Sequence, residues 1–182
     1  MRVYLKLLFV FAIAGLFFSQ THAQKKCKFK YENEDPFTGE ISRGTITTIF
    51  SPSLSTNEYW HIGINRENDK FNILNDIQLS GQLVTHMNIG DSLMFKTADG
   101  TIIKCYSLEE AGPRPKATKI MNRKILNTQY TSIYEVSIQQ LEAFARSEIT
   151  YVRMNIGDEV FEQKVKSKHA RDFLNDARCI IR

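Results

Sequence analysis

Three histidines beyond residue 23 are the side chains most able to do acid–base chemistry: His61, His86 and His169. No two lie close together in the sequence. The chain also lacks a His-Glu-x-x-His motif, a Cys-x-x-Cys pair, a phosphate-binding loop and a Gly-x-Ser-x-Gly motif. A dyad of His61 with an acidic residue such as Glu58, assembled in space, would suit a hydrolase-type enzyme. A single histidine in a strand is more often a packed or surface residue. The sequence therefore predicts no catalytic, cofactor or metal site.

Acidic side chains gather between positions 32 and 40, where Asp35-Pro36 begins a turn and Gly39 ends it. Carboxylates are the ligands that calcium prefers, but the spacing lacks the alternating ligands and closing glutamate of an EF-hand loop. A solvated acidic turn is the favoured interpretation. The acidic residues are Glu32, Glu34, Asp35 and Glu40.

Cysteine is the third chemistry-bearing residue, and three cysteines allow three single pairings. A strand alternation described below places Cys105 inward, where an unpaired thiol is stable. At 100° per residue, Cys179 falls opposite the apolar stripe of its helix, so core burial does not explain it. Cys27 lies near the other end of the predicted domain, and chain ends are often neighbours. We therefore predict a disulfide between Cys27 and Cys179.

Residues 1–23 have the pattern of a secretory signal peptide. Arg2 and Lys6 precede an apolar run from Leu7 to Phe18, and Thr21 and Ala23 are the small residues expected before a cut at Gln24. The run is shorter than the roughly 20 residues of a spanning helix, and no later segment is apolar enough to span a bilayer. We expect a periplasmic or extracellular protein with no integral membrane segment after cleavage.

Cleavage leaves 159 residues, enough for a single domain, residues 24–182, with its own core. Loss of two basic residues lowers the formal net charge from +4 to +2, which gives no argument for nucleic acid as a partner.

The hairpin from Ser92 to Ser107 has a predictable register. A three-residue loop, Ala98-Asp99-Gly100, pairs Leu93 with Cys105 and Phe95 with Ile103 on one face. Two lysines then share the other face with two apolar residues, whereas a two-residue loop would mix lysines into the core. The outward residues are Met94, Lys96, Ile102 and Lys104.

The C-terminal third predicts a β-α-β-β-α ending. Ser137 and Gln140 form a capping box at a helix start. Strands Ile149–Ile156 and Glu159–Val165 follow, and then a helix from about Ser167. Its apolar stripe is Ala170, Phe173, Leu174, Ala177 and Ile181.

The middle of the chain predicts short strands, which are Cys27–Tyr31, Ser42–Phe50, Glu58–Ile64, Phe71–Leu74 and Gln82–Met87. Pro113 and Pro115 mark an exposed break, and the lysine-rich stretch after it favours an edge strand over an anion-binding patch. The fold class is therefore α+β. We expect an antiparallel meander-like β-sheet from about residue 26 to 136, with two C-terminal helices packed against one face.

The pentapeptide Met87-Asn88-Ile89-Gly90-Asp91 recurs as residues 154–158. A duplicated β unit would explain the repeat. Asn and Gly are also common turn residues and the flanking sequences differ, so convergent turn chemistry is the preferred interpretation.

Three stretches resemble small exported proteins of Gram-negative bacteria that form an uncharacterised domain family. They are Cys27 through Phe37-Thr38-Gly39, Gly90-Asp91-Ser92-Leu93 with Asp99-Gly100, and Tyr134-Glu135-Val136-Ser137 through Ile149-Thr150-Tyr151-Val152-Arg153. The resemblance covers most of the mature chain. It implies export and an α+β fold, and it brings no catalytic or binding residue.

The sequence thus favours an exported non-enzymatic module that binds a partner protein or a small ligand. Two alternatives stand beside it: a hydrolase-type enzyme with a site around His61, and a structural subunit of a cell-envelope assembly.

Overall fold

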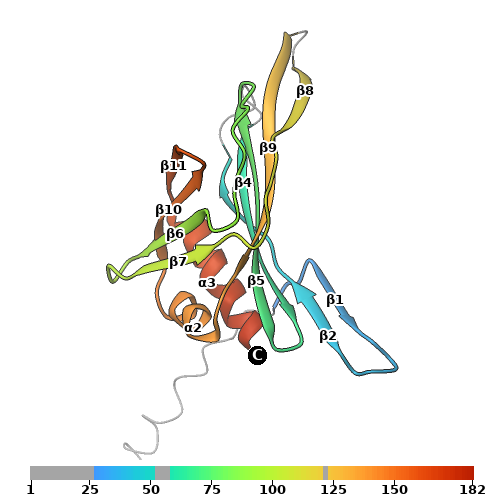
Figure 1. Ribbon diagram of the computed structural model, residues 1–182. Coiled ribbons are helices and arrows are strands. Elements are labelled where there is room, and N and C mark those ends of the chain that lie inside the picture. Colours follow the sequence, from blue (N-terminus) through green and yellow to red (C-terminus); the bar gives the residue numbers. More distant parts are fainter. Residues whose placement is uncertain (1–26, 52–57, 121–122) are drawn as a thin grey trace, which may run out of the picture.

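The computed structural model describes residues 27–51, 58–120 and 123–182 (Figure 1). The predicted signal peptide, residues 1–23, lies outside the described residues. Among the residues that the structure describes, no helix is long and apolar enough to cross a membrane.

Seven strands form the larger sheet, with the order β1-β2-β4-β5-β9-β8 and β3 paired to β4. Every pair is antiparallel. The strands are β1 (Tyr31–Glu34), β2 (Ile41–Gly44), β3 (Thr47–Phe50), β4 (Tyr59–Glu67), β5 (Lys70–Ser80), β8 (Arg114–Ile120) and β9 (Arg123–Glu135).

Four strands form the smaller sheet, also antiparallel, with the order β11-β10-β6-β7. They are β6 (Ser92–Thr97), β7 (Ile102–Tyr106), β10 (Ile149–Ile156) and β11 (Glu159–Lys164). Helices α2 (Ile138–Arg146) and α3 (Ser167–Ile181) pack against each other, and α3 contacts β3 and β4 of the larger sheet and β10 of the smaller one. The α+β class is confirmed.

The predicted single meander sheet is wrong, because β6 and β7 leave it. Strand β5 pairs with β9 instead of β6, and β6 pairs with β10 from the C-terminal third. Both pairings join strands distant in sequence. Alternation within one strand shows which face is apolar but does not identify the strand's neighbours.

Several predicted strand bounds in the first half are also wrong. Cys27–Phe29 is not a strand, and the first strand begins only at Tyr31 and runs to Glu34, into the predicted acidic turn. The predicted strand Ser42–Phe50 divides into β2 and β3, which both pair with β4. Gln82–Met87 forms only a bridge, from Met87 to Ala111. In contrast, β8 is an edge strand as predicted.

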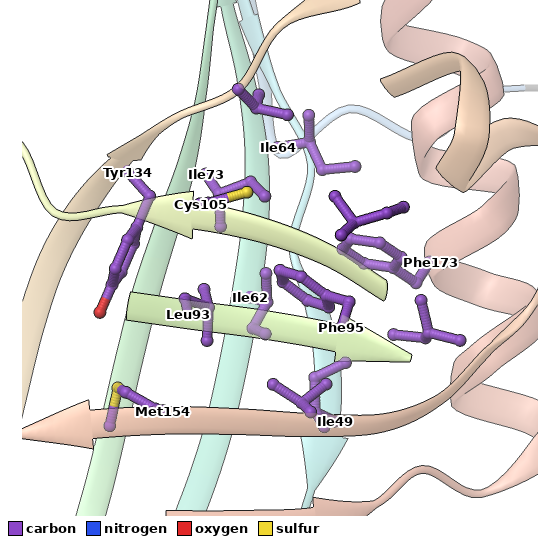
Figure 2. Close-up of a cluster of buried hydrophobic side chains, with 14 of the residues drawn as sticks. Ile49, Ile62, Ile64, Ile73, Leu93, Phe95, Cys105, Tyr134, Met154 and Phe173 are labelled. Carbon is purple, nitrogen blue, oxygen red and sulfur yellow. The ribbon is translucent and has the colours of Figure 1, made fainter. Parts of the chain in front are cut away.

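The core lies between the two sheets (Figure 2). Ile62, Ile64 and Ile73 of the larger sheet meet Leu93 and Phe95 of the smaller one. Phe95 also stacks on Phe173 of α3, with ring centroids 5.7 Å apart. A buried polar group crosses the same space: Asn75 of β5 accepts from the Trp60 indole N–H and contacts the Met154 sulfur, 3.2 Å away on β10. The two sheets are therefore joined by both apolar and polar contacts.

Local sequence rules hold at the β6–β7 hairpin and at helix α2. Leu93 pairs with Cys105 and Phe95 with Ile103, and Gly100 has φ +88°, so the three-residue loop is confirmed. The Ser137 hydroxyl accepts from the Gln140 backbone N–H, and the Gln140 side chain accepts from the Ser137 backbone N–H. Both orphan donors of the helix start are thereby satisfied.

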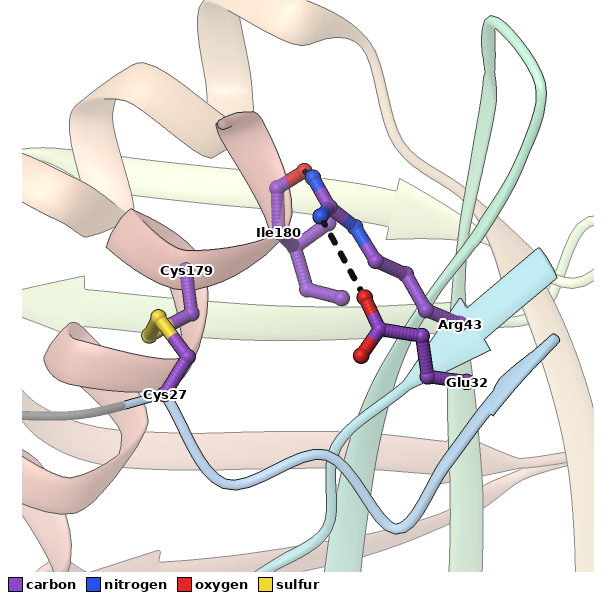
Figure 3. Close-up of a disulfide and its surroundings, with 5 residues drawn as sticks. All are labelled: Cys27, Glu32, Arg43, Cys179 and Ile180. Carbon is purple, nitrogen blue, oxygen red and sulfur yellow. Dashed lines mark hydrogen bonds and ion pairs between the residues drawn. A yellow bond between two sulfur atoms is a disulfide. The ribbon is translucent and has the colours of Figure 1, made fainter. Parts of the chain in front are cut away.

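A disulfide joins Cys27 to Cys179, with Cα atoms 5.6 Å apart (Figure 3). Cys105 is buried and free. The predicted pairing is confirmed. Next to it, Arg43 of β2 donates to the carbonyl of Ile180 and lies 3.9 Å from the Glu32 carboxylate (Figure 3). The disulfide and Arg43 together fasten the start of the larger sheet to the end of α3.

Candidate functional site

The outer face of the four-stranded sheet faces away from the core and combines basic with apolar side chains. On β6, Leu93 and Phe95 point inward and are fully buried, so Met94 and Lys96 point outward. The same alternation on β10 buries Val152 and turns Tyr151 outward. The alternation of side chains along each strand is therefore enough to place these residues on the outer face.

Strand register brings the outward side chains into rows. Lys96 lies opposite Tyr151 on one side and Ile102 on the other. The next row joins Met94 to Arg153 and to Lys104. Directly opposed side chains in a sheet are in contact distance, so each row is a continuous strip of alternating charge and apolar surface.

A groove of about 400 Å³ opens between these rows. Its lining residues are Met94, Phe95, Lys96, Ile102, Tyr151, Arg153 and Glu162. Ile102 is 67% exposed although it is apolar, and Tyr151 beside it is also exposed. A concave surface with an aromatic ring, aliphatic side chains and a few cations suits a ligand that is both apolar and anionic.

The charge of this outer face is mainly positive. Its basic residues are Lys96, Lys104, Arg153 and Lys164. Glu162 is bound by Arg153, whose Nε donates at 2.8 Å and whose second nitrogen donates at 2.5 Å. Among the described residues, no ion pair holds the three lysines. The face therefore presents uncompensated positive charge around its apolar groove.

A second polar cluster occupies the outer face of the seven-stranded sheet and contains His61. The His61 ring stacks on Tyr59 with centroids 4.6 Å apart, and His61 lies opposite Asp76 in the β4–β5 register. The Asp76 carboxylate accepts from the Gln129 amide at 2.8 Å, and the same amide donates to the Tyr59 hydroxyl at 2.9 Å. Asp76 and Tyr59 are therefore already hydrogen-bonded to Gln129.

Burial sets the protonation states of this cluster. Desolvation lowers the pKa of His61, which the nearby Asp76 carboxylate partly offsets, so the imidazole is neutral at pH 7. Burial and the negative charge of Asp76 raise the pKa of Tyr59 to about 12, which keeps its hydroxyl protonated. The cluster could place a neutral imidazole beside a carboxylate, as general base chemistry requires.

The other predicted candidate residues do not join this cluster. Glu58, the partner considered for His61, accepts instead from the backbone N–H of Ser80 at 3.1 Å. His86 is exposed in the segment after β5, and His169 is half-buried in the first turn of α3. The structure thus replaces the His61–Glu58 pair by His61 and Asp76.

His169 lines a second groove, of about 480 Å³, beside the Cys27–Cys179 disulfide. Thr47 of β3 donates its hydroxyl to Asp176 of α3 across this groove at 2.5 Å. This hydrogen bond connects α3 to the larger sheet, so we interpret the groove as part of the packing interface between them.

The described part of the chain contains no group of three or more His, Cys, Asp or Glu residues that could hold a metal ion. In the acidic turn, the Asp35 carboxylate accepts the backbone N–H groups of Phe37 and Thr38 at 2.8 and 3.0 Å. These hydrogen bonds lower the pKa of Asp35. Asp35 therefore stabilises the turn, in agreement with the interpretation of this segment as an acidic turn.

Sequence reasoning placed Met94, Lys96, Ile102 and Lys104 on one face but missed that Tyr151, Arg153 and Glu162 complete it. The pairing of β6 with β10 supplies the missing half. The alternation of residues 149–156 was a usable signal, because it already set Tyr151 and Arg153 on the face opposite Val152 and Met154.

Comparison of the chain with protein-family models, with curated proteins and with solved structures finds no match. The candidate sites therefore rest on their own geometry and chemistry.

Proposed function

We propose that the protein is an exported, non-enzymatic module that binds a partner protein or a small ligand through the outer face of its four-stranded sheet. The observation that carries this proposal is the groove of about 400 Å³, in which exposed Ile102 and Tyr151 lie beside Lys96 and Arg153. Binding of an apolar anion to this surface is favourable, because it covers apolar area and pairs cations with a negative charge.

Export is supported by two observations. The Cys27–Cys179 disulfide is compatible with an oxidising compartment, where such bonds persist. Residues 1–23 have the pattern of a signal peptide. The resemblance to small exported proteins of Gram-negative bacteria agrees with both, and we place the protein in the periplasm or at the cell surface.

An aromatic anion tests the binding face directly. We expect 8-anilinonaphthalene-1-sulfonate to bind the native protein and to shift backbone amide signals of β6, β7 and β10 in NMR spectra. Lys96→Glu should remove this binding, because it reverses the charge at the groove while its exposed site leaves the fold intact. The matched control is Lys70→Glu, an exposed lysine on β5 outside the groove. Signals that shift elsewhere, or equal binding by both variants, would reject the face as the site.

A hydrolase-type enzyme is the alternative function, and the specific observation that favours it is the cluster of Tyr59, His61 and Asp76. An enzyme of this kind should hydrolyse p-nitrophenyl acetate faster than free imidazole does, and His61→Ala should remove that activity. His86→Ala, at an exposed histidine, is the control. Equal rates for the protein and for both variants would exclude the alternative.

A further inference from the structure

The β1–β2 hairpin, residues 31–44, carries the most exposed large apolar side chain of the described chain. Phe37 at its tip is 95% exposed. The tip is ordered: Asp35 accepts the Phe37 and Thr38 backbone N–H groups, and Gly39 with φ +72° donates to the Asp35 carbonyl. The turn therefore holds a phenyl ring in solvent, and covering that ring would remove its apolar area from water.

The hairpin tip is also acidic. Glu34, Asp35 and Glu40 surround Phe37, and no basic residue lies between positions 34 and 40. The one basic residue of the hairpin, Arg43, is held at the hairpin base by Glu32 and by the carbonyl of Ile180. The tip therefore presents an aromatic ring inside negative charge.

The groove on the four-stranded sheet has the complementary properties. Tyr151, Ile102 and Met94 offer an apolar surface, and Lys96 borders it with positive charge, while Arg153 is paired with Glu162 in the same lining. A groove of about 400 Å³ has room for a phenyl ring with its flanking side chains. A ring placed there would lie beside the Tyr151 ring and the Lys96 ammonium group, and both kinds of neighbour favour an aromatic ring energetically.

The hairpin and the groove cannot meet within one molecule. The β1–β2 hairpin projects from one side of the fold, and β6, β7, β10 and β11 lie on the opposite side (Figure 1). Complementary charge on two distant surfaces of the same chain therefore fits an intermolecular contact.

We propose that the protein assembles head to tail, with Phe37 and the acidic β1–β2 hairpin of one copy seated in the basic groove of the four-stranded sheet of a second copy. The proposal rests on the proposed function, because it names the occupant of that binding face. Each such contact leaves the groove of one copy and the hairpin of the other free, so the assembly grows into a chain or closes into a ring. A structural subunit of an envelope assembly would use this property.

Sedimentation velocity over a concentration series, up to about 1 mM to include weak association, tests the assembly. We expect the mean mass to rise with concentration and to fall at high salt, since screening weakens the charge pairing. Phe37→Ser should weaken association about thirtyfold or more, as for a central aromatic anchor. Val84→Ser is the control, because Val84 is 76% exposed and lines neither surface.

A mixing experiment distinguishes head-to-tail assembly from any other. Phe37→Ser keeps an intact groove, and Lys96→Glu keeps an intact hairpin. At the lowest concentration at which the wild-type protein assembles, each variant alone should remain monomeric. An equimolar mixture should form a one-to-one dimer that grows no further, and the double variant should join neither partner.

Each outcome decides the proposal. A monomeric wild-type protein over the whole range overturns it. Association that Phe37→Ser leaves unchanged also overturns it, as does a mixture that stays monomeric. If 8-anilinonaphthalene-1-sulfonate still binds the groove in those cases, the binding face stands and only its occupant is wrong. If that probe fails as well, both proposals fail.

Discussion

The two sheets treat the polar side chains of their outer faces in opposite ways. On the seven-stranded sheet, Gln129 donates to both Asp76 and Tyr59, and Tyr59 stacks on His61. On the four-stranded sheet, Lys96 points into solvent beside exposed Ile102. On the seven-stranded face, these polar side chains are paired with one another. On the four-stranded face, charge and apolar area remain exposed and could be covered by a partner.

This difference follows from the way the two layers are held together. Their inner faces are joined through the core and through Asn75, whereas the disulfide fastens the chain before β1 to α3. The outer faces take no part in these connections. Variants that remove these connections one at a time, and a titration of the outer face, test this comparison.

The largest effect should come from the disulfide, which fastens the chain leading into the larger sheet to α3. Replacing Cys27 and Cys179 together by Ser removes a crosslink between residues 152 apart in sequence. The chain-entropy model gives a loss of up to about 5 kcal/mol in the free energy of unfolding. Urea denaturation of the two proteins measures it.

The control for this experiment is Cys105→Ala with and without reductant. Burial raises the pKa of the Cys105 thiol to about 12, so it should react only after unfolding. The variant should keep the full reductant-dependent loss of stability. A reductant effect that disappears in Cys105→Ala would mean that Cys105 is part of the bond.

The second effect should come from Asn75, which joins the inner faces of the two sheets. Asn75→Ala leaves the Trp60 indole N–H without its acceptor in a fully buried site. An unsatisfied buried donor costs about 2 kcal/mol of unfolding free energy. Asn72→Ala, on the outer side of the same strand, should change stability by less than about 0.5 kcal/mol. Equal losses for both variants would show that the buried hydrogen bond contributes nothing specific.

The parts of the fold that sequence could predict are those set by residues close together. Gly100 fixes the loop of the β6–β7 hairpin, and with it the outward position of Lys96. Ser137 and Gln140 fix the start of α2. The Cys27–Cys179 pair was reachable because only three pairings existed.

The pairing of distant strands could not be predicted, because many alternation patterns are interchangeable. The repeated pentapeptide shows this directly. In residues 87–91 it forms a bridge and a turn before β6, whereas in residues 154–156 it is strand and only Gly157-Asp158 turn. Asp91 even links the copies, since its carboxylate accepts from the backbone N–H groups of Asn88 and Gly157. The same five residues therefore adopt different secondary structures because the segments that pack around them differ.

The same limit applied to the His61 cluster. Strands β4 and β5 join through a two-residue turn, Asn68-Asp69, in which Asn68 has φ +54°. Counting back from that turn pairs Glu67 with Lys70 and therefore His61 with Asp76. A tight turn at Asn68-Asp69 was the signal that would have replaced Glu58 by Asp76.

The third effect concerns α2, the helix through which the chain passes from the larger sheet to the smaller one. Ser137→Ala removes the acceptor for the Gln140 backbone N–H and should cost about 1 kcal/mol of unfolding free energy. Ser167→Ala is the matched control, because α3 begins after Lys166 without a side-chain cap. An unchanged urea midpoint in Ser137→Ala would mean that the capping box does not stabilise this crossing.

The smallest effect should be on the pH dependence of stability, to which His61 on the seven-stranded face contributes. Burial lowers the pKa of His61 below its ordinary value of 6.5, and Asp76 offsets only part of this shift. The unfolded chain therefore binds a proton at His61 before the folded protein does. The stabilising contribution of the neutral imidazole is present above pH 6.5 and is lost as the pH falls through the lower pKa of the folded state.

His61→Gln should remove this dependence while keeping a polar side chain on the outer face. We expect the urea midpoint of the wild-type protein to fall more steeply between pH 7 and pH 5 than that of His61→Gln. His86→Gln, at an exposed histidine, should keep the wild-type slope. A steeper slope in His61→Gln would mean that His61 is stabilised in its charged form, with Asp76 as its ion-pair partner. The seven-stranded face would then carry a charged histidine, and the contrast between the two outer faces would not hold at His61.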